Sequence, residues 1–354
     1  MANVHNENKV MSTEDFLQTQ TELYNLSLAY VKSMALRAAI DLHIPEAIHR
    51  RGGSATLSDI AAETGIHGTK VSHLGRLMRM LAVSGVFSMD DDDGTVYYKL
   101  THVSRLLVAT LEPMVHVLID PLAATALFSL EEWFTDEQAS ALTLFEVAHG
   151  CTRQEMTAKK GTSSLFNAGM VADSRIVTDI LLNEHGSIFE GVGSLVDIGG
   201  GHGGAAAAIA KALPHIKCTV LDLPHVVAGA STETGNVQVV VGDAFQYVPP
   251  ADVVLLKWVL QLWEDQDATK VLRGCREAIP ARGKVIIFDA VVGSACSEDG
   301  PTRETPLLFD VFMMRVGGCE RDEQQWRKII FEAGFTNYKI SVVLGFRSII
   351  EVYP

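Results

Sequence analysis

Residues 195–204 read Leu-Val-Asp-Ile-Gly-Gly-Gly-His-Gly-Gly, and an alanine-rich stretch, residues 205–213, follows them. An apolar run that passes into glycines and then into a helix predicts a strand, a tight loop and a helix packed as one unit. Glycines in such a loop let the backbone turn sharply and come close to a ligand. A glycine loop alone does not identify that ligand, because several nucleotide-like molecules bind to this arrangement.

The C-terminal half continues this pattern. Short apolar runs of β-type residues alternate with helical stretches, which is the rhythm of βαβ units. We therefore expect an α/β domain with a parallel, doubly wound, Rossmann-like sheet. Its predicted strands cover residues 194–198, 218–221, 237–241, 253–256, 285–288 and 341–343.

An acidic residue lies at or near the end of each of the first three predicted strands. Asp222 ends the second strand, where a carboxylate accepts hydrogen bonds from ribose hydroxyls, and Asp243 after the third can accept from an adenine amino group. Asp197 opens the glycine loop, where it would repel a pyrophosphate but suits the cationic amino-acid end of S-adenosylmethionine. Tight turns and helix capping would explain each feature singly, but not the ordered set.

The first third of the chain has a different pattern. Apolar residues recur at helical spacing over residues 23–40, and residues 56–65 predict a short capped helix that ends at glycine. A second amphipathic helix covers residues 69–85. A hairpin follows, with strands at 86–89 and 96–100 and an acidic turn at 90–94. Helix, helix and hairpin in this order indicate a winged-helix domain.

Winged helices often bind DNA, but the charge pattern argues against that role here. The helix that would read bases carries Lys70, Arg76 and Arg79, whereas the wing carries four consecutive aspartates from Asp90. The formal net charge of −14 also repels a phosphate backbone. We expect no nucleic-acid partner, and a dimerisation or packing role for this domain; a transcription factor remains the alternative.

The composition of the chain limits which other classes of protein it can belong to. The 354 residues are 47% hydrophobic and 20% charged, enough for a full core, and no run approaches eighteen uncharged apolar residues. Residues 1–20 lack both an apolar signal core and an Arg-rich transit pattern. The five cysteines form no CxxC pair, so neither a disulfide framework nor a zinc site is indicated. We expect a reduced, cytoplasmic protein without a metal or a membrane partner.

Several motifs together resemble one family, the plant O-methyltransferases of the caffeate and flavonoid type, over nearly the whole chain. The motifs that carry the resemblance are Asp197-Ile-Gly-Gly-Gly, Leu221-Asp-Leu-Pro-His-Val, Gly242-Asp-Ala-Phe, Lys257-Trp-Val-Leu, Leu165-Phe-Asn-Ala-Gly-Met with Asp173-Ser174, and Arg347-Ser-Ile-Ile-Glu-Val-Tyr. The resemblance implies a winged-helix dimerisation domain at 1–120, a helical connector that contributes to the acceptor pocket at 121–185, and an S-adenosylmethionine-binding methyltransferase domain at 186–354. It also implies a homodimer and a small-molecule aromatic acceptor.

The resemblance further assigns site residues. The S-adenosylmethionine contacts fall on Gly199, Asp222, Leu223, Asp243, Ala244 and Lys257, and the lysine would reach the cofactor's carboxylate or a nearby carbonyl. The acceptor pocket would include Asn167, Met170, Met313 and Met314. Methionines can hold a planar aromatic ring through soft, adaptable contacts, although either one alone is equally well explained as core.

One departure from the family concerns the base. The family places a catalytic histidine four residues after the lysine, where this chain has Gln261, and an aspartate next to it, where this chain has Leu262. A phenol with a pKa of about 10 is ionised only about one part in a thousand at neutral pH. Glutamine can bind a hydroxyl but cannot take its proton, and loss of a general base costs on the order of 10²–10⁴ in rate.

Three interpretations of this substitution stay open. The acceptor can arrive ionised, as a hydroxamic acid, an acidified flavonoid hydroxyl or a carboxylic acid, with Gln261 only positioning it. Alternatively, Asp289 or Glu320, the counterparts of the family's two acids beside the histidine, takes the proton directly or through water. Finally, the acceptor can be an amine whose lone pair needs no deprotonation.

We therefore predict methyl transfer to a hydroxyl of a plant secondary metabolite. The alternatives are an N-methyltransferase acting on an aromatic or indolic amine, and a cofactor-binding paralogue without methyl transfer. Residues 151–156, Cys-Thr-Arg-Gln-Glu-Met, also depart from the family, whose members tend to carry an aromatic residue there. This change predicts a reshaped acceptor pocket and argues against a simple phenylpropanoid substrate.

Overall fold

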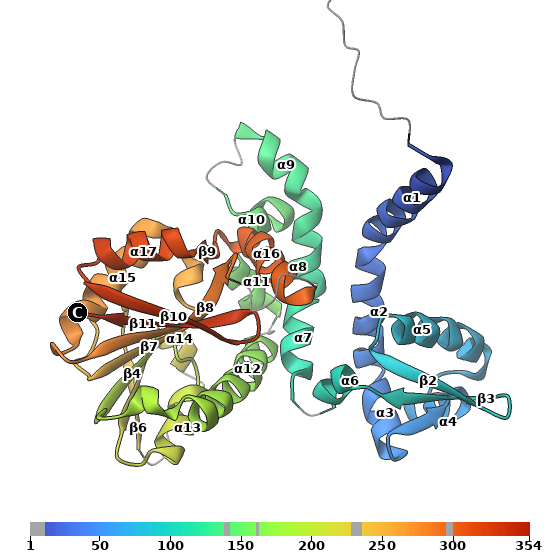
Figure 1. Ribbon diagram of the computed structural model, residues 1–354, viewed down its shortest axis with the longest axis horizontal. Helices are drawn as coiled ribbons and strands as arrows, with labels where there is room; N and C mark the ends of the chain where they lie inside the picture. The colour runs from blue at the N-terminus through green and yellow to red at the C-terminus, as the bar shows by residue number, and fades with distance from the viewer. Residues whose placement is uncertain (1–10, 109, 138–141, 161–162, 228–235, 295–299) are drawn as a thin grey trace, which may run out of the picture. The chain divides into compact units, whose positions relative to one another are not determined.

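The computed structural model describes residues 11–108, 110–137, 142–160, 163–227, 236–294 and 300–354. The chain forms two compact units, Met1–Ile119 and Asp120–Pro354 (Figure 1). The second unit includes residues 121–185, so the division of this region into a separate connector stays a prediction.

The first unit begins with three helices, α1 (Thr13–Ser27), α2 (Ala29–Asp41) and α3 (Ile44–Arg50). The helical spacing of apolar residues over 23–40 falls on α1 and α2, and the helical region begins ten residues earlier, at Thr13. Ser12 caps α1 by accepting a hydrogen bond from the Asp15 N–H, and Leu28 separates α1 from α2 with a ψ of 7°. The first turns of α1 were not predicted, because they are largely polar and the apolar periodicity starts only near Leu23.

The winged-helix pattern is present in this unit. Helix α4 (Leu57–Thr64) has a capping box between Thr56 and Asp59 and ends at Gly65, whose φ of 69° suits glycine. The 3₁₀ turn η1 (Gly68–Lys70) leads into α5 (Val71–Val83), which precedes the hairpin of β2 (Phe87–Asp92) and β3 (Thr95–Leu100). The unit ends with α6 (His102–Leu107) and α7 (Glu112–Leu118).

Two details of the wing differ from the prediction. The aspartates Asp90 to Asp92 pair with β3, so the turn is confined to Asp93 and Gly94, both with positive φ. A third strand, β1 (Ser54–Thr56), pairs antiparallel with β3. It has three residues, too few to show an alternating pattern in the sequence.

The second unit opens with helices, as expected for the helical connector at residues 121–185. They are α8 (Pro121–Ala126), η2 (Leu127–Ser129), α9 (Leu130–Thr135), α10 (Leu144–His149), α11 (Arg153–Lys160) and the long α12 (Ser163–Glu184), followed by η4 (Gly186–Phe189).

One stretch of the described residues, Glu112–Thr135, is long and apolar enough by composition to cross a membrane. It is not a single helix, because α7 ends at Leu118 and α8 begins at Pro121 with Asp120 as its N-cap. A single segment of this kind is weak evidence for a membrane span, and the expectation of no membrane partner stays a prediction.

The sheet of the second unit has the order β10-β11-β8-β7-β4-β5-β6, with β9 beside β8. The neighbours from β8 to β6 pair in parallel, as predicted. The strands are β4 (Ser194–Ile198), β5 (Lys217–Asp222), β6 (Val237–Val241), β7 (Val253–Lys257), β8 (Lys284–Val292), β9 (Arg321–Asp322), β10 (Asn337–Leu344) and β11 (Arg347–Tyr353).

The C-terminal strands differ from the prediction. Residues 341–343 are only part of β10, β11 was not predicted as a strand, and both run antiparallel to their neighbours. The connection between them is too short for a crossover helix, so the chain can only reverse into a hairpin. Gly345, with a φ of 71°, permits that reversal.

Two helical layers cover the sheet (Figure 1). Helices α15 (Asp265–Ala278) and α17 (Glu323–Glu332) pack on one face, and α12 with α13 (Gly204–Ala212) packs on the other. Burial on both faces explains why the central strands are continuously apolar rather than alternating. The remaining elements are α14 (Pro224–Val227), η5 (Leu260–Leu262), α16 (Pro301–Met313) and η6 (Met314–Val316).

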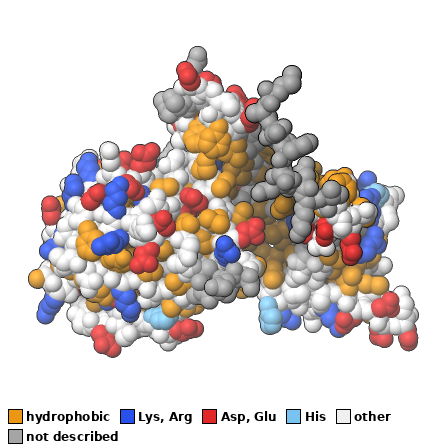
Figure 2. Space-filling model, turned by 45° about the horizontal axis from the view of Figure 1, so that its top comes forward, with side chains coloured by type: hydrophobic (Ala, Val, Ile, Leu, Met, Phe, Trp, Pro, Cys, Tyr) orange, Lys and Arg blue, Asp and Glu red, His pale blue; other side chains and the backbone are white. Residues whose placement is uncertain are grey.

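On the face shown in Figure 2, lysine and arginine side chains are scattered among aspartate and glutamate side chains. No continuous basic patch lies on that face among the described residues. This face therefore does not provide the positive surface that a phosphate backbone requires.

Candidate active site

The glycine loop between β4 and α13 is tightly packed. Gly199 has a φ of 66°, and its N–H donates to the Leu221 carbonyl at 2.8 Å. A Cβ atom on Gly199 would lie 2.8 Å from Cγ2 of Val259, which is closer than real contacts allow. Gly201 and Gly203 also have positive φ. The loop therefore needs glycine for both its conformation and its packing.

Asp197 lies beneath this loop, 2% exposed, and its Oδ2 atom has no hydrogen-bond partner among the described residues. Burial raises the pKa of Asp197 to about 7; the ammonium of Lys257 opposes this rise and the charge of Asp222 adds to it. A cationic group bound here would favour the ionised carboxylate.

The other predicted cofactor residues lie at the ends of β5, β6 and β7 or directly after them. Asp222 accepts hydrogen bonds from the N–H groups of Gly201 at 2.8 Å and Leu223 at 2.7 Å. Asp243 accepts from the Phe245 N–H at 2.9 Å, and Ala244 lies between them in the chain. Since β4, β5, β6 and β7 are parallel, their carboxyl ends meet at one edge, where ligands of open α/β sheets bind. Leu223 is 40% exposed at this edge.

Lys257, the last residue of β7, is paired within the protein. Its Nζ lies 2.7 Å from Oδ2 of Asp173, whose two oxygens also accept from Arg347 at 2.7 and 2.8 Å. Burial would raise the pKa of Asp173, but Lys257 and Arg347 together hold it below its ordinary value. A cofactor carboxylate would have to share the Lys257 ammonium with Asp173.

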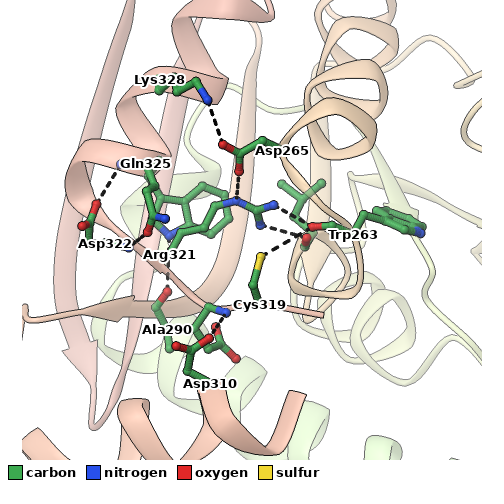
Figure 3. Close-up of polar contacts among 12 residues, drawn as sticks. Trp263, Asp265, Ala290, Asp310, Cys319, Arg321, Asp322, Gln325 and Lys328 are labelled. Carbon is green, nitrogen blue, oxygen red and sulfur yellow. Dashed lines mark hydrogen bonds and ion pairs between the residues drawn. The ribbon is translucent and has the colours of Figure 1, made fainter. Parts of the chain in front are cut away.

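Gln261 lies in the turn η5, which Arg321 holds in place (Figure 3). Arg321 is 1% exposed and donates to the carbonyls of Leu260 at 3.0 Å and Trp263 at 2.6 Å, and to Asp265 at 3.0 Å. The Gln261 carbonyl accepts from the Cys319 N–H at 2.9 Å. Oε1 of the Gln261 side chain is buried and has no partner among the described residues.

Asp289 and Glu320 form a buried acidic pair. Both oxygens of Asp289 and Oε2 of Glu320 lack hydrogen-bond partners among the described residues. Burial, and then the charge of Glu320, raises the pKa of Asp289 well above its ordinary value. Burial, and then Asp310, raises the pKa of Glu320 to about 8. Close to neutral pH the pair therefore retains a proton that exposed carboxyls would lose.

The candidate acceptor residues lie on α12, α16 and η6. Asn167 Nδ2 is 3.3 Å from Nε2 of His202 in the glycine loop. Met313 is buried, and its Cε would lie 2.9 Å from a Cβ atom on Gly318, whose Cβ would also lie 2.4 Å from the Gln261 carbonyl. Met170 and Met314 are half-buried. Among the described residues, no group of three or more His, Cys, Asp or Glu side chains could hold a metal ion.

Two residues near these elements were not assigned from the sequence. Arg315, directly after Met314, is 6% exposed. Arg153 was noted only as part of the altered segment 151–156. The available signal was an arginine inside the apolar run Met313-Met-Arg-Val316, a position where a charge is rarely buried without a partner.

Comparison with known families gives two matches. The O-methyltransferase domain matches residues 128–336, and the O-methyltransferase dimerisation domain matches residues 24–110. The chain belongs to the O-methyltransferase family. It is an enzyme whose cofactor is S-adenosylmethionine, and the predicted family and fold class are confirmed.

Relatives support the assignment over the full length. Acetylserotonin O-methyltransferase 1 of Oryza sativa subsp. japonica is 56% identical, with 99% of each chain covered. 5-Pentadecatrienyl resorcinol O-methyltransferase of Sorghum bicolor is 47% identical over 97% of this chain and 98% of its own. The crystal structure of CalO1, a methyltransferase in calicheamicin biosynthesis in its SAH-bound form, has a TM-score of 0.81 at 26% identity, covering 96% of this chain and 98% of that one.

Features of the sheet edge fit S-adenosylmethionine. At Gly201 in the glycine loop a Cβ atom would meet nothing within 4 Å, so the loop leaves open space at this position. The unpartnered Oδ2 of Asp197 can accept from a cationic ammonium group. The Asp222 carboxylate retains lone pairs for ribose hydroxyls after accepting two backbone hydrogen bonds.

Proposed function

We propose that this O-methyltransferase methylates a hydroxyl of an aromatic plant secondary metabolite and that Asp289 and Glu320 take over the role of the missing histidine base. The observation that carries the proposal is the buried acidic pair with unpartnered oxygens, next to the turn that holds Gln261. Phenolic and indolic acceptors are the class that fits, because relatives include proteins named for acetylserotonin and for a resorcinol.

S-Adenosylmethionine, when bound, supplies a methyl group on a positively charged sulfur. Gly199, Asp222, Leu223, Asp243, Ala244 and Lys257 would hold it, and Asn167, Met170, Met313 and Met314 would line the acceptor pocket. Gln261 positions the acceptor hydroxyl by hydrogen bonding. The hydroxyl proton passes to the Asp289–Glu320 pair, directly or through one water.

The carboxyl pair is a suitable acceptor for that proton because of its environment. A base works best when its pKa lies near the working pH, and Glu320 has a pKa of about 8. An ordinary carboxylate, with a pKa of about 4, would be a much weaker base towards a phenol. The raised pKa of the pair thus restores part of the driving force for proton transfer that a histidine base supplies in the family.

Further features of the proposal concern assembly and location. The dimerisation domain over residues 24–110 supports a homodimer. A cytoplasmic location is consistent with the scattered cysteines, of which Cys151, Cys218, Cys275 and Cys319 are unpaired among the described residues.

The test compares Glu320→Gln and Asp289→Asn with the native enzyme on phenolic and indolic acceptors between pH 6 and 9. We expect the native rate to rise with pH and level off above pH 8, because the pair must be ionised to accept a proton. Each variant should lose on the order of 10²-fold or more in kcat together with this pH dependence. Glu304→Gln, an exposed acid on α16, is the matched control and should behave like the native enzyme.

Other outcomes identify the competing interpretations. A rate that is independent of pH and unchanged in both variants would mean that the acceptor arrives ionised, especially if Gln261→His gains activity on ordinary phenols. Transfer to amines alone would indicate an N-methyltransferase. Cofactor binding without formation of S-adenosylhomocysteine would indicate a paralogue that does not transfer methyl groups.

A further inference from the structure

Two arginines of the second unit lie near the candidate acceptor residues. Arg153 begins α11, and Arg315 lies in η6 directly after the pocket candidates Met313 and Met314. Met313 in turn packs at Gly318, whose backbone lies against the Gln261 carbonyl. Through these contacts, η6 connects Arg315 to the turn proposed to position the acceptor hydroxyl.

Each guanidinium group stacks on an aromatic ring. The Cζ atom of Arg153 lies 4.3 Å from the centre of the Phe166 ring, and that of Arg315 lies 3.9 Å from the centre of the Phe312 ring. Phe166 immediately precedes Asn167 on α12. Stacking fixes the plane of a guanidinium group while leaving its N–H donors free at the edge.

These donors have no acceptor among the described residues. Neither arginine makes an ion pair or a side-chain hydrogen bond there, and Nε of Arg315 is fully buried without a partner. The buried Arg321, by contrast, satisfies its donors with two carbonyls and a carboxylate. A buried arginine without acceptors is costly unless a bound group supplies them.

The local charge is also unbalanced. Burial lowers the pKa of Arg315 to about 9, and the positive charge of Arg153 lowers it further; the only carboxylate acting on it is Asp120. Asp120 also raises the pKa of Arg153, against the effect of burial. Two guanidinium groups thus share one carboxylate, and that carboxylate already caps α8 by accepting from the Leu122 N–H at 2.9 Å.

We propose that Arg153 and Arg315 bind a carboxylate on the acceptor, so that the substrate is a hydroxylated aromatic acid. The inference rests on the proposed function, since it names the acceptor of that same site. One surplus positive charge matches one negative charge, and the planar fork of arginine matches a carboxylate in shape. The carboxylate would anchor one end of the acceptor while the hydroxyl at the other end faces Gln261.

The test uses matched acceptors, 4-hydroxyphenylacetic acid and 5-hydroxyindole-3-acetic acid, each with its methyl ester. We expect the native enzyme to prefer the acids. Arg315→Gln and Arg153→Gln should each raise KM for the acids about 10- to 100-fold, because one partner of a charged pair is removed. In both variants, KM for the esters, and kcat for acids and esters alike, should change less than about twofold. Arg303→Gln, an exposed arginine on α16, is the control and should leave all values unchanged.

A substitution that conserves the positive charge distinguishes a loss of carboxylate binding from a loss of folding. Arg315→Lys should retain part of the preference for acids, and thermal unfolding identifies any variant that fails to fold. If the native enzyme does not prefer acids, or if the glutamine variants weaken acids and esters equally, the proposal is wrong.

Calorimetric titration of the acids into enzyme saturated with S-adenosylhomocysteine needs no turnover. Arginine-dependent binding without methyl transfer would overturn the proposed function but keep this inference. Methyl transfer that does not depend on the two arginines would keep the proposed function and overturn this inference.

Discussion

At the scale of single residues, the unusual feature of this enzyme is where its acids are buried. Asp197, Asp289 and Glu320 all lie inside the second unit, and each has at least one oxygen without a partner among the described residues. Buried carboxyls of this kind cost stability when ionised, which proteins tolerate mainly at functional sites. By the resemblance to the family, Gln261 stands at the position of the histidine base, so the proposed Asp289–Glu320 base pair has no imidazole to orient.

The raised pKa of Glu320 predicts a pH dependence of stability. The folded protein keeps a proton on Glu320 up to about pH 8, whereas an ordinary glutamate releases it near pH 4.5. This contribution to stability is therefore fully present below pH 4.5 and is lost as the pH rises through 8. Glu320→Gln cannot ionise, so its unfolding free energy relative to the native protein should increase between pH 5 and 9. Urea titrations at pH 5, 7 and 9 measure this; parallel curves for the two proteins would contradict it.

At the scale of elements, the turn η5 depends on a side chain from β9. Arg321 donates to carbonyls on both sides of Gln261 and pairs with Asp265, which also pairs with Lys328 at 3.1 Å (Figure 3). A short 3₁₀ turn of three residues has little stability of its own. The position of Gln261 is therefore set by Arg321.

We expect Arg321→Met to destabilise the protein by about 3–5 kcal/mol, because two buried carbonyls and a carboxylate lose their partner. Where the variant still folds, kcat should fall more than substrate affinity, since the turn is no longer fixed. Lys328→Met is the matched control: it removes the exposed partner of the same Asp265 and should cost less than about 1 kcal/mol. Equal losses for the two variants in urea unfolding would refute the role given to Arg321.

At the scale of the whole molecule, the first unit exposes apolar side chains along α1 and α2. Large apolar residues there are 38–73% exposed, which is costly for a protein that remains a monomer. These are Phe16, Leu17, Leu23, Tyr24, Leu26, Leu28, Tyr30, Val31 and Met34. The match of the dimerisation domain to this unit supports their burial against a second copy.

Leu17→Glu combined with Tyr24→Glu should shift the protein towards the monomer. The two residues lie seven apart on α1 and so share one helix face, where paired charges would be buried in the interface. Sedimentation at several concentrations should show a dissociation constant at least tenfold weaker. Val83→Glu changes a residue that is 84% exposed on α5 of the same unit and should leave the dimer intact. A native protein that sediments as a monomer would reject the homodimer itself.

The local features of this chain were determined by its sequence. The strand, glycine loop and helix from Ser194 to Ala212, the acids Asp222 and Asp243 near the ends of β5 and β6, and the capped helix α4 were predicted at their places. Each depends on residues close together in the chain: the φ that glycine permits, a capping side chain, or an apolar run. The family motifs, which are also short runs, indicated the cofactor.

Only the tertiary structure decided which distant side chains meet. Asp173 and Arg347 are 174 residues apart in sequence, yet they bond at 2.7 Å and, with Lys257, form one buried network. The antiparallel β11, the stacked arginines Arg153 and Arg315, and the burial that raises the pKa of Glu320 likewise arise from packing. Burial and charge proximity depend on the folded arrangement of segments. A local pattern, such as the arginine within the apolar run 313–316, can mark a residue but does not show which distant side chains it meets.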